Sequence, residues 1–136
     1  MDFFTAMEVS ASGLSVERTR MNVAASNLAN ASTTRAAGGG PYQRRDVVVQ
    51  SQPIAGAAPG VAGVAVTAIR ADASPPRLEH DPGHPDADAR GYVAYPNVNP
   101  VEEMVDMITA SRAYEAGVTA LTTSVSMAER ALGIGR

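Results

Sequence analysis

Residues 104–132, MVDMITASRAYEAGVTALTTSVSMAERAL, repeat apolar side chains at alternating steps of three and four residues. Residues 4–28, FTAMEVSASGLSVERTRMNVAASNL, do the same near the other end of the chain. This spacing places an apolar seam along each of two long helices, and such seams pack against other helices. The two stretches therefore predict the fold, and they favour a protein that works by assembling over one that works by catalysis.

The two seams differ in regularity, because Arg18 interrupts the first one. The other members of the first seam are Phe4, Met7, Ala11, Leu14, Met21, Ala25 and Leu28. The second seam consists of Met104, Met107, Ser111, Tyr114, Val118, Leu121, Val125, Ala128 and Leu132.

Each helix also carries a second face. The first has short polar side chains at Ser15, Thr19, Asn22, Ser26 and Asn30, and the second has small ones at Ala113, Gly117, Ala120, Ser124 and Ala128. Small residues let a neighbouring helix approach closely. Each helix therefore has more contact surface than the other can cover, which predicts packing against copies or partners.

Start and stop signals bound the two helices. Asp2 as N-cap predicts a first helix from about residue 3 to about residue 30. Residues 99–102, Asn-Pro-Val-Glu, combine a capping side chain, a proline in the first turn and a Glu three residues after the cap. This pattern starts the second helix, which we expect to run to about Leu132 and to stop at Gly133.

The middle of the chain is rich in glycine and proline. Residues 31–42 break the helix, and residues 43–50 and 61–69 read as strands that pair as a hairpin. Residues 72–90 read as an extended loop, and residues 91–95 as a short strand. The prediction is an α+β chain in which long N- and C-terminal helices pack as an antiparallel coiled coil beside a small β-rich and loop-rich middle. The predicted units are 1–34, 35–98 and 99–136.

Composition excludes several classes of protein. The formal net charge is -3, which provides no electrostatic footprint for nucleic acid. The chain has no Cys, which excludes disulfides, zinc thiolate sites and thiol nucleophiles. No apolar run approaches the roughly 20 residues of a membrane span. The first residues contain an acid and no basic segment before an apolar core, so we expect no cleaved signal peptide.

One loop contains potential metal ligands. His80, His84, Asp86 and Asp88 are suitable ligand types, and a metal-dependent enzyme is the alternative that they suggest. Prolines at 82 and 85 prevent a helix from aligning the two histidines, so we favour a turn-rich loop whose Asp and His side chains cap the local backbone. We expect no catalytic residue, no metal and no cofactor.

Two groups of charged residues have ordinary interpretations. The pair Arg44 and Arg45 reads as solvated or subunit-facing charge, and Glu103 and Asp106 with Arg112 read as ion pairs on a helix surface. A third class, a membrane-surface amphipathic helix protein, would need basic helix faces. The acidic start of the second helix opposes it.

Several stretches resemble one known family. Residues 18–34, RTRMNVAASNLANASTT, resemble the N-terminal signature of bacterial flagellar rod and hook proteins, and residues 101–118, VEEMVDMITASRAYEAGV, resemble their C-terminal signature. GGPYQRRDVVV (39–49), DPGHPDADARGYVAYPNVN (81–99) and LGIGR (132–136) are similar to the proximal-rod branch of that family. Arg90 and Gly117 depart from the pattern that we expect of the family.

The resemblance implies a structural subunit of the basal-body rod. Its terminal helices would form an α-helical coiled coil lining an axial tube, and its middle would project outward. It would be exported without a cleaved signal peptide by the flagellar type III apparatus and would polymerise in the cell envelope. Its partners would be copies of itself, other proximal and distal rod subunits, the basal-body adaptor protein and the membrane-ring protein, without nucleic acid and without direct membrane insertion.

The seams, the polar face and the family signatures together supply candidate subunit contacts. On the first helix these are Phe4, Met7, Leu14, Met21, Asn22, Ser26, Asn27, Leu28 and Asn30. On the second helix they are Met104, Met107, Ile108, Tyr114, Val118, Leu121 and Val125.

Overall fold

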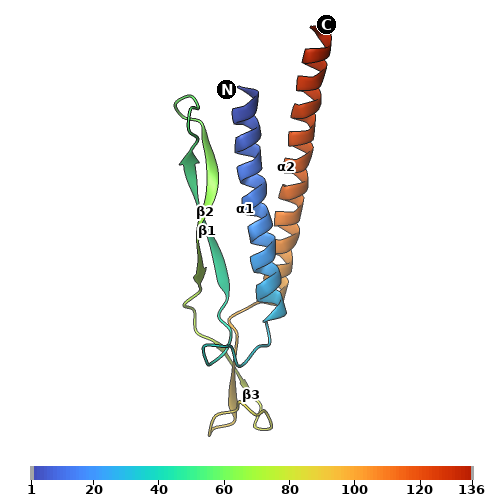
Figure 1. The fold of residues 1–136 in the computed structure, drawn as a ribbon. Coiled ribbons are helices and arrows are strands. Elements are labelled where there is room, and N and C mark those ends of the chain that lie inside the picture. The colour runs from blue at the N-terminus through green and yellow to red at the C-terminus, as the bar shows by residue number, and fades with distance from the viewer. Residues whose placement is uncertain (1, 136) are drawn as a thin grey trace.

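The computed structural model describes residues 2–135 as two long helices beside two small antiparallel sheets. Helix α1 (Phe3–Ala29) and helix α2 (Pro100–Ile134) run side by side in opposite directions (Figure 1). Between them in sequence come β1 (Arg45–Pro53), β2 (Ala62–Ala71), β3 (Arg77–His80) and β4 (Tyr92–Tyr95). The predicted α+β class is confirmed.

Both predicted helix caps are present. The carboxylate of Asp2 accepts a hydrogen bond from the Thr5 amide at 2.7 Å, and the side chain of Asn99 accepts one from the Val101 amide at 3.0 Å. Each satisfies a donor that has no partner within the helix itself. The predicted stop at Gly133 is wrong by two residues, because Gly133 keeps helical geometry and the C-cap is Gly135.

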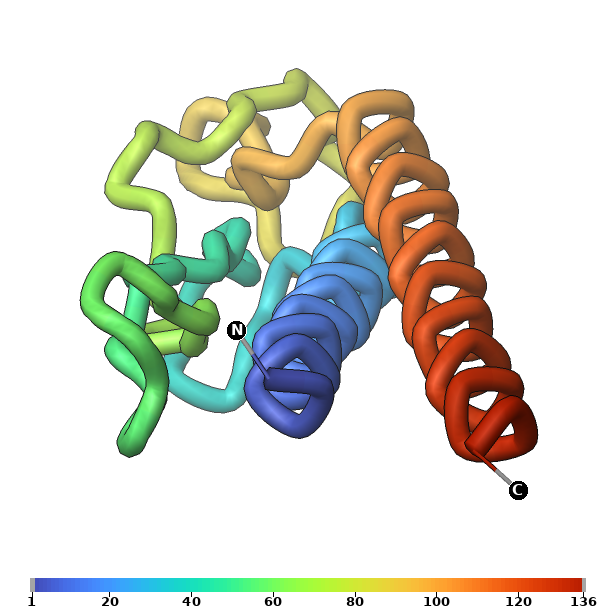
Figure 2. The backbone as a smooth tube through the Cα atoms, turned by 90° about the horizontal axis from the view of Figure 1, so that it is seen from above, coloured from blue at the N-terminus to red at the C-terminus, as the bar shows by residue number. Residues whose placement is uncertain are grey.

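The predicted hairpin is confirmed and lies along α1 (Figures 1 and 2). β1 and β2 pair antiparallel, with a register shift between Val48 and Val49. The hydroxyl of Ser12 in α1 accepts a hydrogen bond from the Val64 amide at 3.1 Å. A Cβ at the neighbouring Gly63 would lie 2.9 Å from the same hydroxyl, so a glycine at this position permits the close approach.

The prediction that residues 72–90 form loop throughout is wrong at one place. Residues Arg77–His80 form β3, which pairs antiparallel with β4. The stretch RLEH has neither the alternation nor the β-branched residues of a typical strand. It becomes a strand because β4, which holds the fully buried Val93, supplies the partner for its backbone.

The hydrophobic core is small. Its buried apolar side chains are Val16, Ala24, Tyr42, Val93, Val98 and Ala110. Large apolar side chains are exposed at the far ends of both helices, including Phe4 at 79 % and Leu132 at 75 %. The subunit alone therefore leaves much of its helix surface uncovered.

The two helices approach closely at one end and separate toward the chain termini (Figures 1 and 2). Eight buried or half-buried residues of α2 recur at heptad spacing: Glu103, Met107, Ala110, Tyr114, Gly117, Leu121, Ser124 and Ala128. Other half-buried residues of α2 lie outside this repeat: Pro100, Ser111, Val125 and Ser126. The face that carries the repeat combines half of the predicted apolar seam with half of the predicted small-residue face. Met104 and Val118 from the seam, and Ala113 and Ala120 from the small face, are exposed.

Candidate functional site

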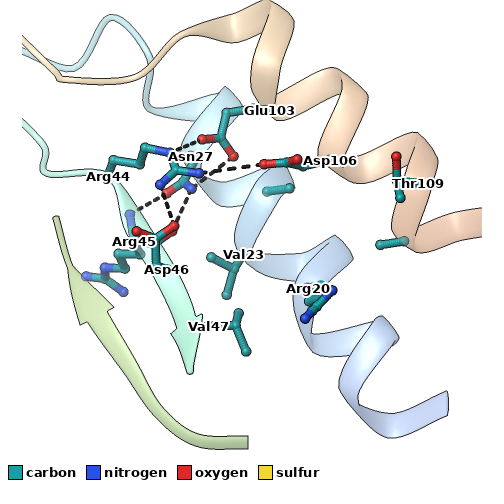
Figure 3. A pocket seen from close by; sticks show the side chains of 12 residues that line it. Arg20, Val23, Asn27, Arg44, Arg45, Asp46, Val47, Glu103, Asp106 and Thr109 are labelled. Atoms are coloured by element: carbon teal, nitrogen blue, oxygen red, sulfur yellow. Dashed lines mark hydrogen bonds and ion pairs between the residues drawn. The ribbon is translucent and has the colours of Figure 1, made fainter. Parts of the chain in front are cut away.

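A cluster of hydrogen-bonded polar side chains joins the two helices to the first strand. We call Asn27, Tyr42, Arg44 and Glu103 the polar junction. Figure 3 shows Asn27, Arg44 and Glu103 of this junction. The junction brings together the last turn of α1, the first turn of α2 and the residues around the start of β1. Asn27 and Glu103 are each only 1 % exposed, so their polar atoms depend on protein partners.

The amide of Asn27 uses all four of its hydrogen-bonding positions in the junction. Its Nδ2 donates to the Arg45 carbonyl at 2.9 Å and to Glu103 Oε2 at 3.1 Å. Its Oδ1 accepts from the Tyr42 hydroxyl at 2.9 Å and from the Arg45 amide at 3.0 Å. One side chain of α1 thereby holds the other helix and the start of the hairpin.

Arg44 neutralises the buried carboxylate of Glu103. Its Nε donates to Glu103 Oε1, and its other nitrogens pair with Asp46 and, at 3.6 Å, with Asp106. Partial burial acts to lower the pKa of Arg44, but the hydrogen bond and charge of Glu103, with Asp46, raise that pKa above its usual range. The guanidinium is therefore a permanent positive charge inside the junction.

Two interpretations of these charges from the sequence are wrong. Arg44 is half-buried and pairs with Glu103, whereas Arg45 is exposed as expected. Glu103 is buried and does not pair on the helix surface with Arg112. Glu103 lies on the heptad face that packs on α1, at a position where apolar residues are usual. The sequence did contain a signal, because the charged Glu103 interrupts an otherwise mostly apolar packing face. Its partner Arg44 lies 59 positions away in sequence, so the sequence did not identify the pair.

A cavity of about 220 Å³ opens beside the junction. Three arginines and three carboxylates are among its lining residues, so the charges balance: Arg20, Arg44, Arg45, Asp46, Glu103 and Asp106. In the part of the chain that the structure describes, no group of three or more potential metal ligands comes together. The contacts of this site hold α1, α2 and the start of β1 together.

The loop with the histidines confirms the expected turn structure. His84 Nδ1 accepts a hydrogen bond from the Asp86 amide at 3.0 Å, and Asp88 accepts bonds from the Arg90 and Tyr92 amides at 2.8 and 2.9 Å. The ring of His80 stacks edge-on against Tyr92, at a centroid distance of 5.0 Å. These side chains cap local backbone and pack on tyrosines.

Asp86 ties this loop to the segment that follows α1. Its carboxylate accepts a hydrogen bond from Thr34 Oγ1 at 2.8 Å and pairs with Arg35. The Thr34 hydrogen bond, followed by Arg35, lowers the pKa of Asp86 by more than desolvation raises it. A lowered pKa in the folded state means that the contact stabilises the fold above the ordinary carboxyl pKa and is lost as pH falls through the folded value.

We therefore expect the Asp86 carboxyl to titrate in acid below the ordinary value of 3.8. Thr34→Val should raise its midpoint, because the largest stabilising hydrogen bond of the ionised form is removed. Carbon-detected NMR titration of the Asp86 side chain measures both midpoints. An unchanged midpoint in Thr34→Val would show that this bond does not hold the loop.

The candidate subunit contacts divide by exposure. Phe4, Asn22, Met104, Ile108 and Val118 are exposed. Those that are half-buried are Met7, Leu14, Met21, Ser26, Leu28, Asn30, Met107, Tyr114, Leu121 and Val125. Asn27 is buried, and its hydrogen bonds are to its own chain.

An apolar group lies on the side of α2 that faces away from α1. Met104 and Ile108 in this group were predicted subunit contacts, whereas Val101 and Val105 were not. We call Val101, Met104, Val105 and Ile108 the outer patch, and their exposed fractions range from 46 % to 67 %. The spacing of three, one and three residues puts them on one helix face opposite Glu103 and Ala110. The spacing of these four residues is visible in the sequence, but the longer apolar seam of the same helix was used to predict its packing face.

The two helices are in close contact at Gly117. A Cβ placed there would lie 2.7 Å from Leu14 Cδ2. We expect Gly117→Leu to lower the free energy of unfolding by about 1–3 kcal/mol, because overpacking forces the helices apart. Urea unfolding followed by far-ultraviolet circular dichroism measures this effect.

A compensating double variant and a control at a neighbouring position accompany Gly117→Leu. Gly117→Leu combined with Leu14→Ala should recover much of the loss, since the volume is moved from one helix to the other. Ala116→Leu adds the same side chain at an exposed neighbouring position and should have little effect. Equal losses for Ala116→Leu and Gly117→Leu would contradict the close contact.

Neither α1 nor α2 carries an apolar stretch long enough to cross a membrane.

Comparison with known proteins finds one group of relatives. Residues 7–36 match the family model described as flagella basal body rod protein, and residues 89–134 match that of the flagellar basal body rod FlgEFG protein C-terminal. The flagellar basal-body rod protein FlgC of Bacillus subtilis is 42% identical, with both chains covered completely. FlgC of Borreliella burgdorferi is also 42% identical over 98% of each chain, and FlgC of Salmonella typhimurium is 40% identical over the whole of both.

Proposed function

Because this chain belongs to the FlgC family of flagellar basal-body rod proteins, we propose that it polymerises through its terminal helices in the proximal part of the rod. It is a structural rod subunit of the flagellar basal body. The observation that carries the assignment is the match over the full length of both chains.

The finer assignments belong to the same proposal. The subunit acts as part of a drive shaft, without catalytic activity, and it contacts proximal and distal rod subunits, the adaptor protein and the membrane-ring protein. The flagellar type III apparatus exports it without a cleaved signal peptide. The units 1–34 and 99–136 pack as a coiled coil in the assembled rod, and 35–98 identifies the subunit to its neighbours.

Exposed apolar surface supports assembly through the helices. Phe4 and Leu132 lie near the far ends of α1 and α2, where the two helices have separated (Figure 1). Leu132 is the last member of the predicted apolar seam of α2, and α1 does not cover it. A shaft under torque needs many repeated contacts of this kind, and neighbouring helices would bury these side chains on assembly.

The test replaces apolar side chains at the open ends. In a motile bacterium that lacks its own FlgC, the unaltered chain should restore motility and appear in isolated basal bodies. Phe4→Glu with Leu132→Glu should abolish both, because charges would have to be buried between subunits. Ile69→Glu changes an exposed apolar residue of β2 and serves as the control. Normal motility of the Phe4 and Leu132 double variant would contradict assembly through these helix ends.

A further inference from the structure

We propose that the outer patch of α2 packs against the exposed face of α1 in a neighbouring copy of this chain. The inference rests on the proposed function, and it names which two helix faces meet. The exposed face of α1 consists of Phe4, Glu8, Ala11, Ser15, Arg18, Asn22, Ala25 and Ala29, spaced alternately by four and three residues. It lies opposite the buried Val16 and Asn27.

The two faces differ in side-chain size in a complementary way. The outer patch presents Met, Ile and two Val, all extending from α2. The C-terminal half of the exposed α1 face presents Ala25 and Ala29, whose short side chains leave space for larger ones. Large side chains of one helix that enter spaces between small ones of another give close helix packing.

The two faces lie at the same height in one subunit. Asn27 is hydrogen-bonded to Glu103, and Leu14 lies against Gly117, so the antiparallel register of the helices is known at two points. Residues 101–115 of α2 are therefore level with residues 15–29 of α1. The hairpin occupies the side of α1 opposite α2 (Figure 2), so the exposed α1 face points to a third side of the helix. A second copy beside the first, turned about the long axis of the helices, brings its outer patch to the small half of the exposed α1 face without changing these levels.

Charged residues on the two faces favour an axial shift of one copy relative to the other. Without an axial shift, Arg18 of one copy would lie level with Arg112 of the other, and like charges repel. A shift of about one helical turn, about 5 Å, places Arg18 opposite Glu115 instead. The same shift sets Ile108 against Ala25 and Met104 against Ala29. Arg18 and Glu115 have no ion pair within residues 2–135, so both charges are available for this contact.

This contact joins two different faces, so it is heterologous. A heterologous contact with an axial shift builds an open helical array, whereas a two-fold contact of the outer patch with itself would give a closed dimer. The geometry therefore predicts a rising lateral arrangement of copies around an axis.

Single cysteines test the contact directly, because the natural chain has none. Ala25→Cys and Ile108→Cys copies are produced together in the strain without its own FlgC, and basal bodies are isolated and mildly oxidised. We expect a disulfide-linked dimer of the two variants and little dimer from either variant alone. Ala25→Cys with Ala113→Cys, an exposed position outside the patch, is the matched control.

Reversing the charges of Arg18 and Glu115 provides a second test of the contact. Arg18→Glu or Glu115→Arg should lower the yield of cross-linked dimer about tenfold, and the two reversals made in the two partner faces should restore it. The same cysteine pair is also tested for cross-linking in the purified full-length chain at rising concentration. This measurement allows the contact to be tested for variants that do not enter the rod.

Three results would overturn the contact while leaving the rod assignment intact. The first is absence of the mixed dimer in both settings while motility is normal. The second is an efficient dimer of Ile108→Cys alone, which would mean a two-fold contact. The third is cross-linking of Ile108→Cys to a different rod protein in place of a second copy. Loss of the rod assignment itself would appear separately, as failure of the unaltered chain to restore motility.

Discussion

Arg44→Met should lower the free energy of unfolding by about 3–5 kcal/mol, the range measured when one partner of a buried ion pair is removed. Glu103 is 1 % exposed, and without Arg44 its carboxylate would stay buried beside Asn27 without its ion-pair partner. The first turn of α2 and the start of β1 should both loosen, because the junction holds them together. Urea unfolding measures the loss, and hydrogen exchange of the two segments shows where it falls.

The double variant separates charge from packing. Arg44→Met with Glu103→Met should recover most of the stability, since apolar residues of similar volume can replace a buried ion pair without loss. Arg70→Met removes an exposed arginine of β2 and should change stability little. If the Arg44 variant and the Arg70 variant lost the same small amount, the junction would not depend on this ion pair.

Asn27→Leu should lower the free energy of unfolding by about 3 kcal/mol. The substitution keeps the volume but leaves the Tyr42 hydroxyl and the backbone amide and carbonyl of Arg45 without their partner. A buried polar group that loses its partner costs about 1–3 kcal/mol. Urea unfolding measures the loss, and the NMR signals of the Tyr42 ring report whether the junction has opened.

Asn22→Leu is the control for this prediction, because Asn22 lies on the same helix but is exposed. Its effect should stay within about 0.5 kcal/mol. The losses of the Asn27 and Arg44 variants should not add, since both side chains contact Glu103. Full additivity would mean that the four side chains do not act as one network.

Most of the architecture was predictable because it depends on local signals. The caps at Asp2 and Asn99 compete only with neighbouring residues for the same backbone donors, so their positions follow from the sequence. The hairpin was predictable for a similar reason, because glycine and proline confine the turns. β3 was not, since a strand with weak propensity forms only when a partner strand offers its backbone.

The candidate site was predictable in part. Heptad spacing identified two helices that leave surface uncovered, and the family signatures contain both Asn27 and Glu103. The roles of these two residues were not predictable. Helix periodicity shows which residues share a face, but it does not show whether that face meets the partner helix, the hairpin or solvent.

By itself, the sequence determined the two helices, their caps, the hairpin and the family of the chain, because these depend on residues close together or on whole motifs. Only the tertiary structure decided which face of α2 meets α1, and that Arg44 neutralises Glu103 across 59 positions of sequence. The physical reason is that a buried charge is stable only beside its partner. That partner can be identified only when the chain segments have been brought together in space.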